Sequence, residues 1–293
     1  MLACAVLFCA MGSTVRILVA EHGASVFWVG WCRFVIGALA MLIPGVLGVW
    51  SLQVVNRRVL VCRGLFGATG QFLLFAVIAY VGLGRGTVLA YLMGVVGAVS
   101  GIFILKEHPR PIVFAAVGLA TVGVLLSCRA GVPVGVEWLA IGAALASGVT
   151  LSFVRLMRRT DSTQTIFLSQ GVFGSVMLLP FIFSSPVPST IDVWLLVALM
   201  SAFDIGGQLC MTEGLGLLPV ARGSALMMLT PVLSLLAGVL FFSESLLPLQ
   251  WFGCVIVIGA STISVASRSM TITSQPSQNA EPDRLARAGE SGR

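Results

Sequence analysis

Long apolar runs, separated by short connections, are the feature that most restricts how this chain can fold. A run of about twenty apolar residues is long enough to cross a lipid bilayer as an α-helix. We therefore predict an all-α integral membrane protein with ten transmembrane helices. Their predicted bounds are Leu2–Val19, Val26–Gly48, Val59–Val81, Gly86–Leu105, Ile112–Cys128, Glu137–Leu156, Thr165–Phe183, Ile191–Gly214, Ala221–Phe242 and Leu249–Ser267.

The composition agrees with a bilayer as the solvent. Hydrophobic residues make up 58% of the chain and charged residues only 10%, whereas a soluble domain usually carries about 25% charged residues. A soluble fold of this length could not bury so much apolar surface. Basic residues of a membrane protein mostly mark its cytoplasmic side, so the net charge of +6 does not indicate binding to nucleic acid.

Lys and Arg residues in the connections predict the orientation of the helices. With the amino terminus inside, the outer connections carry mainly Arg85 and Arg129, and the inner connections carry Arg57, Arg58, Lys106, Arg110, Arg158, Arg159 and Arg222. We predict that both termini are cytoplasmic and that the protein lies in the cell (inner) membrane. The polar composition of 268–293 predicts a disordered cytoplasmic tail. The first helix begins almost at the first residue, which leaves open a start codon further upstream.

One element of the sequence occurs twice. Gly84–Glu107 and Ala221–Glu244 align without a gap. The paired positions include Arg85 with Arg222, Gly86 with Gly223, Gly101 with Gly238 and Glu107 with Glu244, and beyond the ends Gln71 with Gln208 and Pro111 with Pro248. The second copy lies five predicted helices, an odd number, further along the chain than the first, so it enters the membrane inverted. We predict two inverted five-helix repeats, 1–128 and 137–267, an arrangement typical of transporters that work by alternating access.

Polar residues inside the predicted spans are the candidates for a substrate cavity, because such residues usually face protein or a wet cavity. Asp204, Gln208 and Thr212 recur every four residues and form one polar stripe on a helix. Gln71 adds an amide at the symmetric position. Arg33 either pairs with an acidic group or faces an anionic part of the substrate. Tyr91 adds an amphipathic ring, for which packing is an equal alternative.

Asp204 is the most specific of these candidates, since it lies about halfway along its predicted helix. A carboxyl group there could load and release a proton and so couple transport to a proton gradient. It could also bind a substrate ammonium group directly. The structural alternatives are a fixed ion pair with Arg33 or a hydrogen bond to Gln208.

Interrupted helices at matching places in two repeats indicate a transport site. Pro231 removes one backbone hydrogen bond from its predicted helix and is expected to kink it. Gly94 stands at the paired position of the first repeat and could flex there less sharply. We predict Gly94 and Pro231 as hinges.

Other chemistry has little support in the sequence. His22 and His108 fall in connections on opposite sides and cannot share a metal. The seven cysteines lie in or beside apolar helices without a CxxC motif, and no phosphate-binding loop for ATP occurs. We predict no cofactor and no enzyme activity. Two alternatives are a membrane-embedded enzyme acting on a lipid-linked substrate and a scaffold without transport activity.

Several short motifs lie in or at the ends of the predicted helices, namely Arg33-Phe34, Arg63-Gly64, Lys106-Glu107, Thr230-Pro231 and Ser243-Glu244. In these motifs the chain resembles the EamA-type permeases of the drug/metabolite transporter superfamily. Gly94 departs from the pattern, since it stands where the other half has Pro231. The resemblance implies a ten-helix secondary permease whose central cavity is lined by both halves. The function expected is secondary transport, as an exporter, of a small polar or amphipathic metabolite. The partners expected are this substrate and the bilayer, with a homodimer left open.

Overall fold

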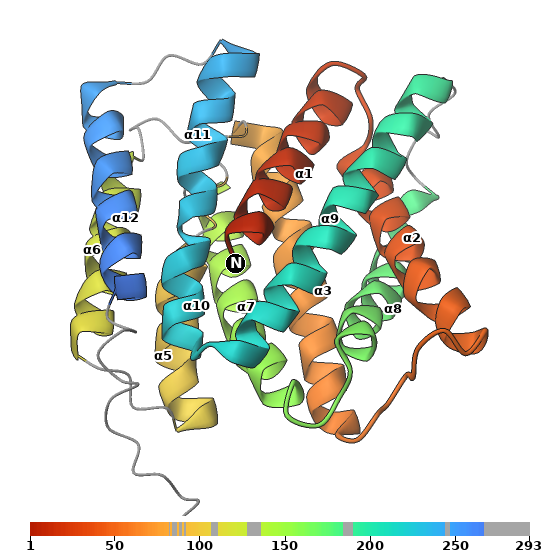
Figure 1. Ribbon diagram of the computed structural model, residues 1–293. Helices are drawn as coiled ribbons and strands as arrows, with labels where there is room; N and C mark the ends of the chain where they lie inside the picture. Colours follow the sequence, from red (N-terminus) through yellow and green to blue (C-terminus); the bar gives the residue numbers. More distant parts are fainter. Residues whose placement is uncertain are drawn as a thin grey trace, which may run out of the picture.

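The computed structural model describes residues 1–81, 83, 87, 90, 92–106, 111–127, 136–183, 190–243 and 247–266, and these form α-helices and their connections, without a strand. The helices, labelled as in Figure 1, are α1 (Leu2–Ala20), α2 (Val26–Val46), α3 (Arg57–Val81), α5 (Met93–Leu105), α6 (Pro111–Ser127), α7 (Val136–Met157), α8 (Thr163–Ile182), α9 (Ile191–Leu217), α10 (Val220–Met227), α11 (Leu229–Phe242) and α12 (Pro248–Ala266). The predicted tail over 268–293 lies outside the described residues.

The chain has the helices of a multi-pass membrane protein. Seven helical stretches among the described residues are long and apolar enough to cross a bilayer, namely Leu2–Ala20, Val26–Val46, Arg57–Tyr80, Trp138–Met157, Thr163–Ile182, Ile191–Leu217 and Val220–Phe242. Three further apolar helices are shorter, at Met93–Leu105, Phe114–Gly123 and Trp251–Ala260. Eight of the predicted helices begin and end within a few residues of the observed ones.

The other two predicted helices differ from the structure. The one predicted over Ala221–Phe242 is broken at Met228 into α10 and α11. The one predicted over Gly86–Leu105 is interrupted by a turn at Leu92: Thr87 and Ala90 before the turn are helical, and α5 begins after it at Met93. In a continuous helix the ring of Pro231 would clash with the carbonyl group four residues earlier. The break therefore falls just before Pro231, which lies in the first turn of α11.

Helices from the two halves of the chain pack against each other in matching pairs. The helix α3 packs on α7, and α9 packs on α1; likewise α5 packs on α7, and α11 on α1. The helices α6 and α12 pair at one edge of the molecule, and α2 and α8 pair toward the other edge (Figure 1). The remaining helices lie between these two pairs.

Small residues let the paired helices approach closely, which matters where lipid supplies no hydrophobic drive for association. A Cβ atom added at Gly70 of α3 would lie 2.8 Å from the backbone nitrogen of Ser147 in α7. One added at Gly123 of α6 would lie 2.7 Å from the carbonyl oxygen of Gly253 in α12. Larger residues at these positions would force the helices apart.

Two helices at matching positions end in the same local conformation. Lys106 after α5 and Ser243 after α11 are both left-handed, with φ of 54° and 52°. Each donates its backbone N–H to the carbonyl of a glycine, Gly101 in one case and Gly238 in the other. The duplicated sequence thus produces a duplicated helix end.

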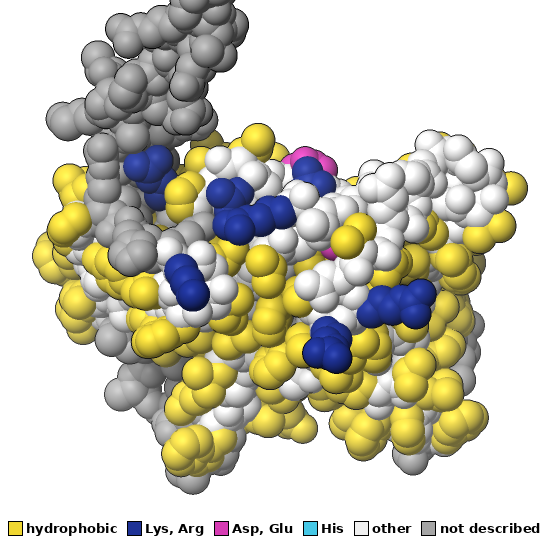
Figure 2. Space-filling view, turned by 90° about the horizontal axis from the view of Figure 1, so that it is seen from below, with side chains coloured by type: hydrophobic (Ala, Val, Ile, Leu, Met, Phe, Trp, Pro, Cys, Tyr) yellow, Lys and Arg dark blue, Asp and Glu magenta, His cyan; other side chains and the backbone are white. Residues whose placement is uncertain are grey.

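Lys and Arg side chains gather on the face of the molecule that Figure 2 shows from below. Arg158 pairs with Glu213 at 2.9 Å and thereby joins the end of α7 to the end of α9. Asp161, before α8, accepts a hydrogen bond of 2.8 Å from the backbone N–H of Val55. The hydrogen bond between Val55 and Asp161 fixes the connection between α2 and α3 to the connection between α7 and α8.

Candidate functional site

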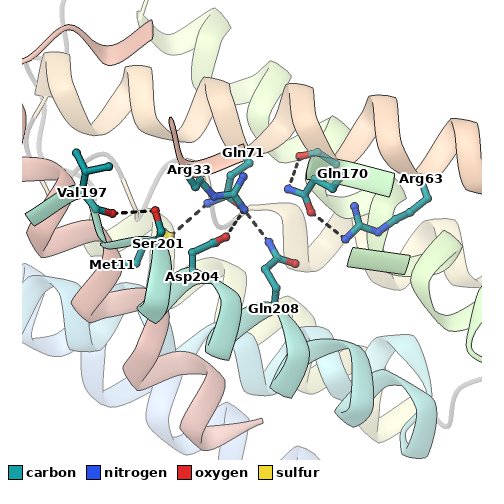
Figure 3. A network of polar contacts seen from close by, with 10 residues as sticks. Met11, Arg33, Arg63, Gln71, Gln170, Val197, Ser201, Asp204 and Gln208 are labelled. Carbon is teal, nitrogen blue, oxygen red and sulfur yellow. Dashed lines mark hydrogen bonds and ion pairs between the residues drawn. The ribbon is translucent and has the colours of Figure 1, made fainter. Parts of the chain in front are cut away.

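A buried ion pair joins α2 to α9 in the interior of the helix bundle (Figure 3). Arg33 Nη2 lies 2.7 Å from Asp204 Oδ2, and both side chains are only 1% exposed. The guanidinium group also lies 4.5 Å from the centroid of the Phe34 ring, a distance at which a cation is attracted to the ring face. Of the arrangements that the sequence left open for Asp204, the ion pair with Arg33 is the one present.

A pair of amides lies beside the ion pair. Gln208 Nε2 donates to Gln71 Oε1 over 3.4 Å, and Gln71 Nε2 lies 3.5 Å from the sulfur of Met11. Gln71 and Gln208 are the two symmetric positions of the repeated sequence, so equivalent residues of α3 and α9 meet. Both contacts are long for hydrogen bonds, and Gln208 Oε1 has no partner among the described residues. The amides are therefore available for other hydrogen bonds.

The polar stripe predicted on α9 exists and is buried. Asp204, Gln208 and Thr212 are 1%, 3% and 0% exposed, and Ser201 extends the stripe by one more turn. Ser201 donates to the carbonyl of Val197 in its own helix, whereas the hydroxyl of Thr212 has no hydrogen-bond partner among the residues described. Facing the protein interior rather than lipid, the stripe follows the pattern expected of polar residues at membrane depth.

Two buried polar residues were missed as site candidates, Arg63 of α3 and Gln170 of α8. Arg63 Nη2 donates to Gln170 Oε1 over 2.9 Å, and Gln170 Nε2 donates to the carbonyl of Gly67 over 3.0 Å. Arg63 is 0% and Gln170 2% exposed. Arg63 had entered the sequence analysis only as part of a family motif near a helix end. A survey of every charged or amide residue inside the apolar runs would have found both.

A small cavity lies among these helices and has a volume of about 40 Å³. This is room for about three water molecules, so a metabolite would require the cavity to enlarge. The predicted residues Gln71 and Gln208 line it, and Arg33, Asp204 and Thr212 do not. Its other lining residues are Gly67, Ser147, Thr150 and Gln170, with the apolar Phe8, Met11, Leu74, Met93, Leu151, Met211 and Met227.

The two predicted hinge residues lie at the interrupted helices rather than in the cavity wall. Gly94 is in the first turn of α5, and a Cβ atom there would clash with the side chain of Met228, where α10 gives way to α11. The start of α5 therefore packs against the break in the other half.

Tyr91 lies outside the described residues, so its predicted place in the cavity stays untested. No group of three or more His, Cys, Asp or Glu side chains that could hold a metal occurs in the part of the chain described.

Apolar helices around a buried polar network define a multi-pass membrane protein. The chain belongs to the EamA-like transporter family, whose model matches residues 1–129 and 135–266. A solved structure titled "Crystal structure of protein" is similar in fold, with 20% sequence identity, a TM-score of 0.69, and 92% of this chain and 98% of that chain covered. No curated protein matches the chain. The family is one of transporters and not of enzymes.

Proposed function

We propose that the protein is a secondary transporter that moves a small polar or amphipathic metabolite across the cytoplasmic membrane by alternating access. The observation that carries this proposal is the buried polar network, to which α2 and α3 of one half and α8 and α9 of the other contribute. Charged and polar groups inside a membrane protein are costly, and where they occur they usually mark a substrate pathway or a binding site. We propose the predicted cavity residues that line or adjoin this network, Arg33, Gln71, Asp204, Gln208 and Thr212, as the substrate site.

We further propose that residues 1–128 and 137–267 are inverted repeats. The support is that the helix packing keeps the same pattern when the two halves are exchanged. The contact of α3 with α7 corresponds to that of α9 with α1, and the contact of α5 with α7 corresponds to that of α11 with α1. The equivalent left-handed ends at Lys106 and Ser243 add to it. Two halves of this kind can exchange conformations and open a central site to one side of the membrane at a time.

We propose that the protein lies in the inner membrane and that both of its termini are cytoplasmic. The basic face shown in Figure 2 would then point toward the cytoplasm. The proposed direction of transport is export. A homodimer remains a prediction from the sequence.

Proton coupling through Asp204 is a separate proposal. Asp204 Oδ1 has no hydrogen-bond partner among the described residues, so one oxygen of the carboxylate is open to a proton. A proton on Asp204 would cancel its attraction to Arg33 and release the two helices that the ion pair joins. Uptake and loss of this proton on opposite sides of the membrane would then link helix movement to the proton gradient.

Transport itself is tested by reconstituting the full chain into proteoliposomes and measuring uptake and efflux of mass-labelled metabolites. The candidates would come from metabolites that accumulate in cells lacking the protein and are depleted in cells that overproduce it. We expect saturable flux that empty liposomes lack. Hydrolysis or modification of a lipid-linked substrate without flux would instead favour a membrane enzyme, and neither result would favour a scaffold.

A further inference from the structure

Arg63 is a fully buried cation without an acidic partner. It lies within the first two turns of α3 and is 0% exposed. The buried acidic residues that the structure describes have other partners: Asp204 pairs with Arg33, and Asp161 accepts from the backbone N–H of Val55 and the hydroxyl of Thr160. Arg63 therefore has no counter-charge in direct contact among the described residues. Burying a charge in the interior without a counter-charge is strongly unfavourable. The free protein therefore carries a cost that an anion at this position would remove.

The side chain of Arg63 is held in a built site. Gln170 of α8 accepts from one of its terminal nitrogens and donates to the carbonyl of Gly67, so the guanidinium group is fixed between α3 and α8 (Figure 3). A Cβ atom at position 67 would clash with Arg63 Nη1, so the guanidinium group requires a glycine there. Both Gly67 and Gln170 line the central cavity.

Two nitrogens of this guanidinium group remain free. Nε and Nη1 of Arg63 have no hydrogen-bond partner among the residues described. A guanidinium group presents its N–H groups in a planar fork that matches the oxygens of a carboxylate or a phosphate. A single arginine balances a single negative charge, whereas a phosphate monoester carries about −1.5 to −2 at neutral pH. The charge favours a carboxylate.

We propose that the substrate of this transporter is a small monocarboxylate, and that Arg63, positioned by Gly67 and Gln170, binds its carboxylate group. The rest of the molecule would lie against the apolar and methionine side chains of the cavity, such as Met11, Met93 and Met211, which adapt readily to different shapes. Arg63 is not itself among the lining residues, so a carboxylate reaches it from the cavity, past Gly67 and Gln170, only when the cavity enlarges. This inference rests on the proposed transport function in calling the ligand a substrate, whereas the binding site rests on the contacts of Arg63.

Binding to the full chain in lipid nanodiscs tests the proposal, with acetate, benzoate and inorganic phosphate as probes and benzamide as the neutral isostere of benzoate. We expect at least one of the two carboxylates to bind and to raise the unfolding temperature, with phosphate and benzamide weaker. Arg63→Gln should weaken carboxylate binding by about 10- to 100-fold, because the variant loses a charge-assisted hydrogen bond to the carboxylate. Arg159→Gln removes the same charge from an exposed position and should leave the affinity unchanged.

A second variant separates position from charge. Gly67→Ala keeps Arg63 but displaces its guanidinium group, so we expect it to weaken carboxylate binding as well. The unliganded Arg63→Gln protein should unfold at or above the wild-type temperature, because an unpaired buried charge has been removed. Lower stability with unchanged carboxylate affinity would make Arg63 a structural residue and overturn the proposal.

Three further results would overturn it. These are the failure of both carboxylates to bind the wild type, tighter binding of phosphate than of either carboxylate, and equal binding of benzoate and benzamide. Flux in proteoliposomes is measured separately. Carboxylate binding without flux would contradict transport and leave the anion site intact, whereas flux of neutral solutes without carboxylate binding would contradict the site and leave transport intact.

Discussion

At the scale of single residues, Arg33 and Asp204 form a buried ion pair, and the loss of either partner is expected to be strongly destabilising. Each ion costs several kcal/mol to bury, and their mutual attraction offsets that cost only while both are present. Arg33 gains further stabilisation from the ring of Phe34 at 4.5 Å. The pair joins α2 to α9, so a change to one residue is expected to act on the packing of both helices.

Arg33→Met leaves the carboxylate of Asp204 buried and unpaired, and we expect it to destabilise the protein by about 3–5 kcal/mol. The double variant Arg33→Met with Asp204→Leu should recover most of this loss. Unfolding of the detergent-solubilised protein in denaturant measures both. Arg158→Met at the more exposed pair with Glu213 is the control and should cost about 1 kcal/mol or less. A double variant no more stable than Arg33→Met would contradict this account of the pair.

Asp204→Asn tests the proton coupling, because it keeps the shape of the side chain and removes its titration. We expect the variant to lose accumulation driven by a pH gradient in proteoliposomes and to keep downhill exchange of the substrate. Weakened substrate affinity in both assays would indicate a direct contact between Asp204 and a substrate ammonium group. Normal behaviour in both would leave Asp204 as a structural residue.

At the scale of helices, the interruption between α10 and α11 and its contact with α5 are the features most relevant to movement. The helix is interrupted at Met228 because the ring of Pro231 would clash with the backbone of an intact preceding turn. Gly94 at the start of α5 packs against Met228, so the break of one half contacts the first turn of the matching helix in the other. Movement at the break is therefore expected to displace α5.

Pro231→Ala permits a continuous helix from α10 into α11, so we expect normal membrane insertion and slower transport. The rate of substrate exchange over a full substrate titration measures the effect. Transport at the wild-type rate throughout would show that the break has no role in switching.

Gly94→Ala adds a methyl group against the fully buried Met228, and overpacking of this kind typically costs about 1–3 kcal/mol. We expect slower exchange, and we expect Met228→Ala in the same chain to restore part of the rate by vacating the space. If the double variant is slower than Gly94→Ala alone, the contact between the two interrupted helices is not what limits movement.

For the whole molecule, the sequence was sufficient to predict the helices but not their junctions. Twenty-residue apolar runs determine where a membrane helix begins and ends, as in α2 and α9. Pro231 was predicted to kink its helix, but the full break at Met228 was not predicted, because the effect of the proline ring falls on the preceding turn. The sequence could not decide which residue pairs with Asp204. The relative position of α2 and α9 depends on packing between distant segments, and the periodicity of polar residues within one helix contains no information about that packing.

The orientation of the whole molecule is tested by labelling single cysteines in a cysteine-free background. An impermeant maleimide added to intact cells should label a cysteine at position 187, in the connection before α9, and should miss Arg159→Cys at the basic face. Position 187 lies outside the described residues, and its outer location is a prediction from the distribution of Lys and Arg in the sequence. The opposite labelling pattern would reverse the proposed orientation.

The central claim is that one buried site opens to each side of the membrane in turn, and the accessibility of a cysteine at position 71 tests it most directly. Gln71 lines the cavity, so in a cysteine-free background Gln71→Cys should react with an impermeant maleimide from either side of sealed vesicles. In a two-state equilibrium, any change that favours one state lowers the population of the other. Adding Gly94→Ala should therefore change the two labelling rates in opposite directions. Labelling from one side only, or two rates that rise or fall together, would contradict alternating access.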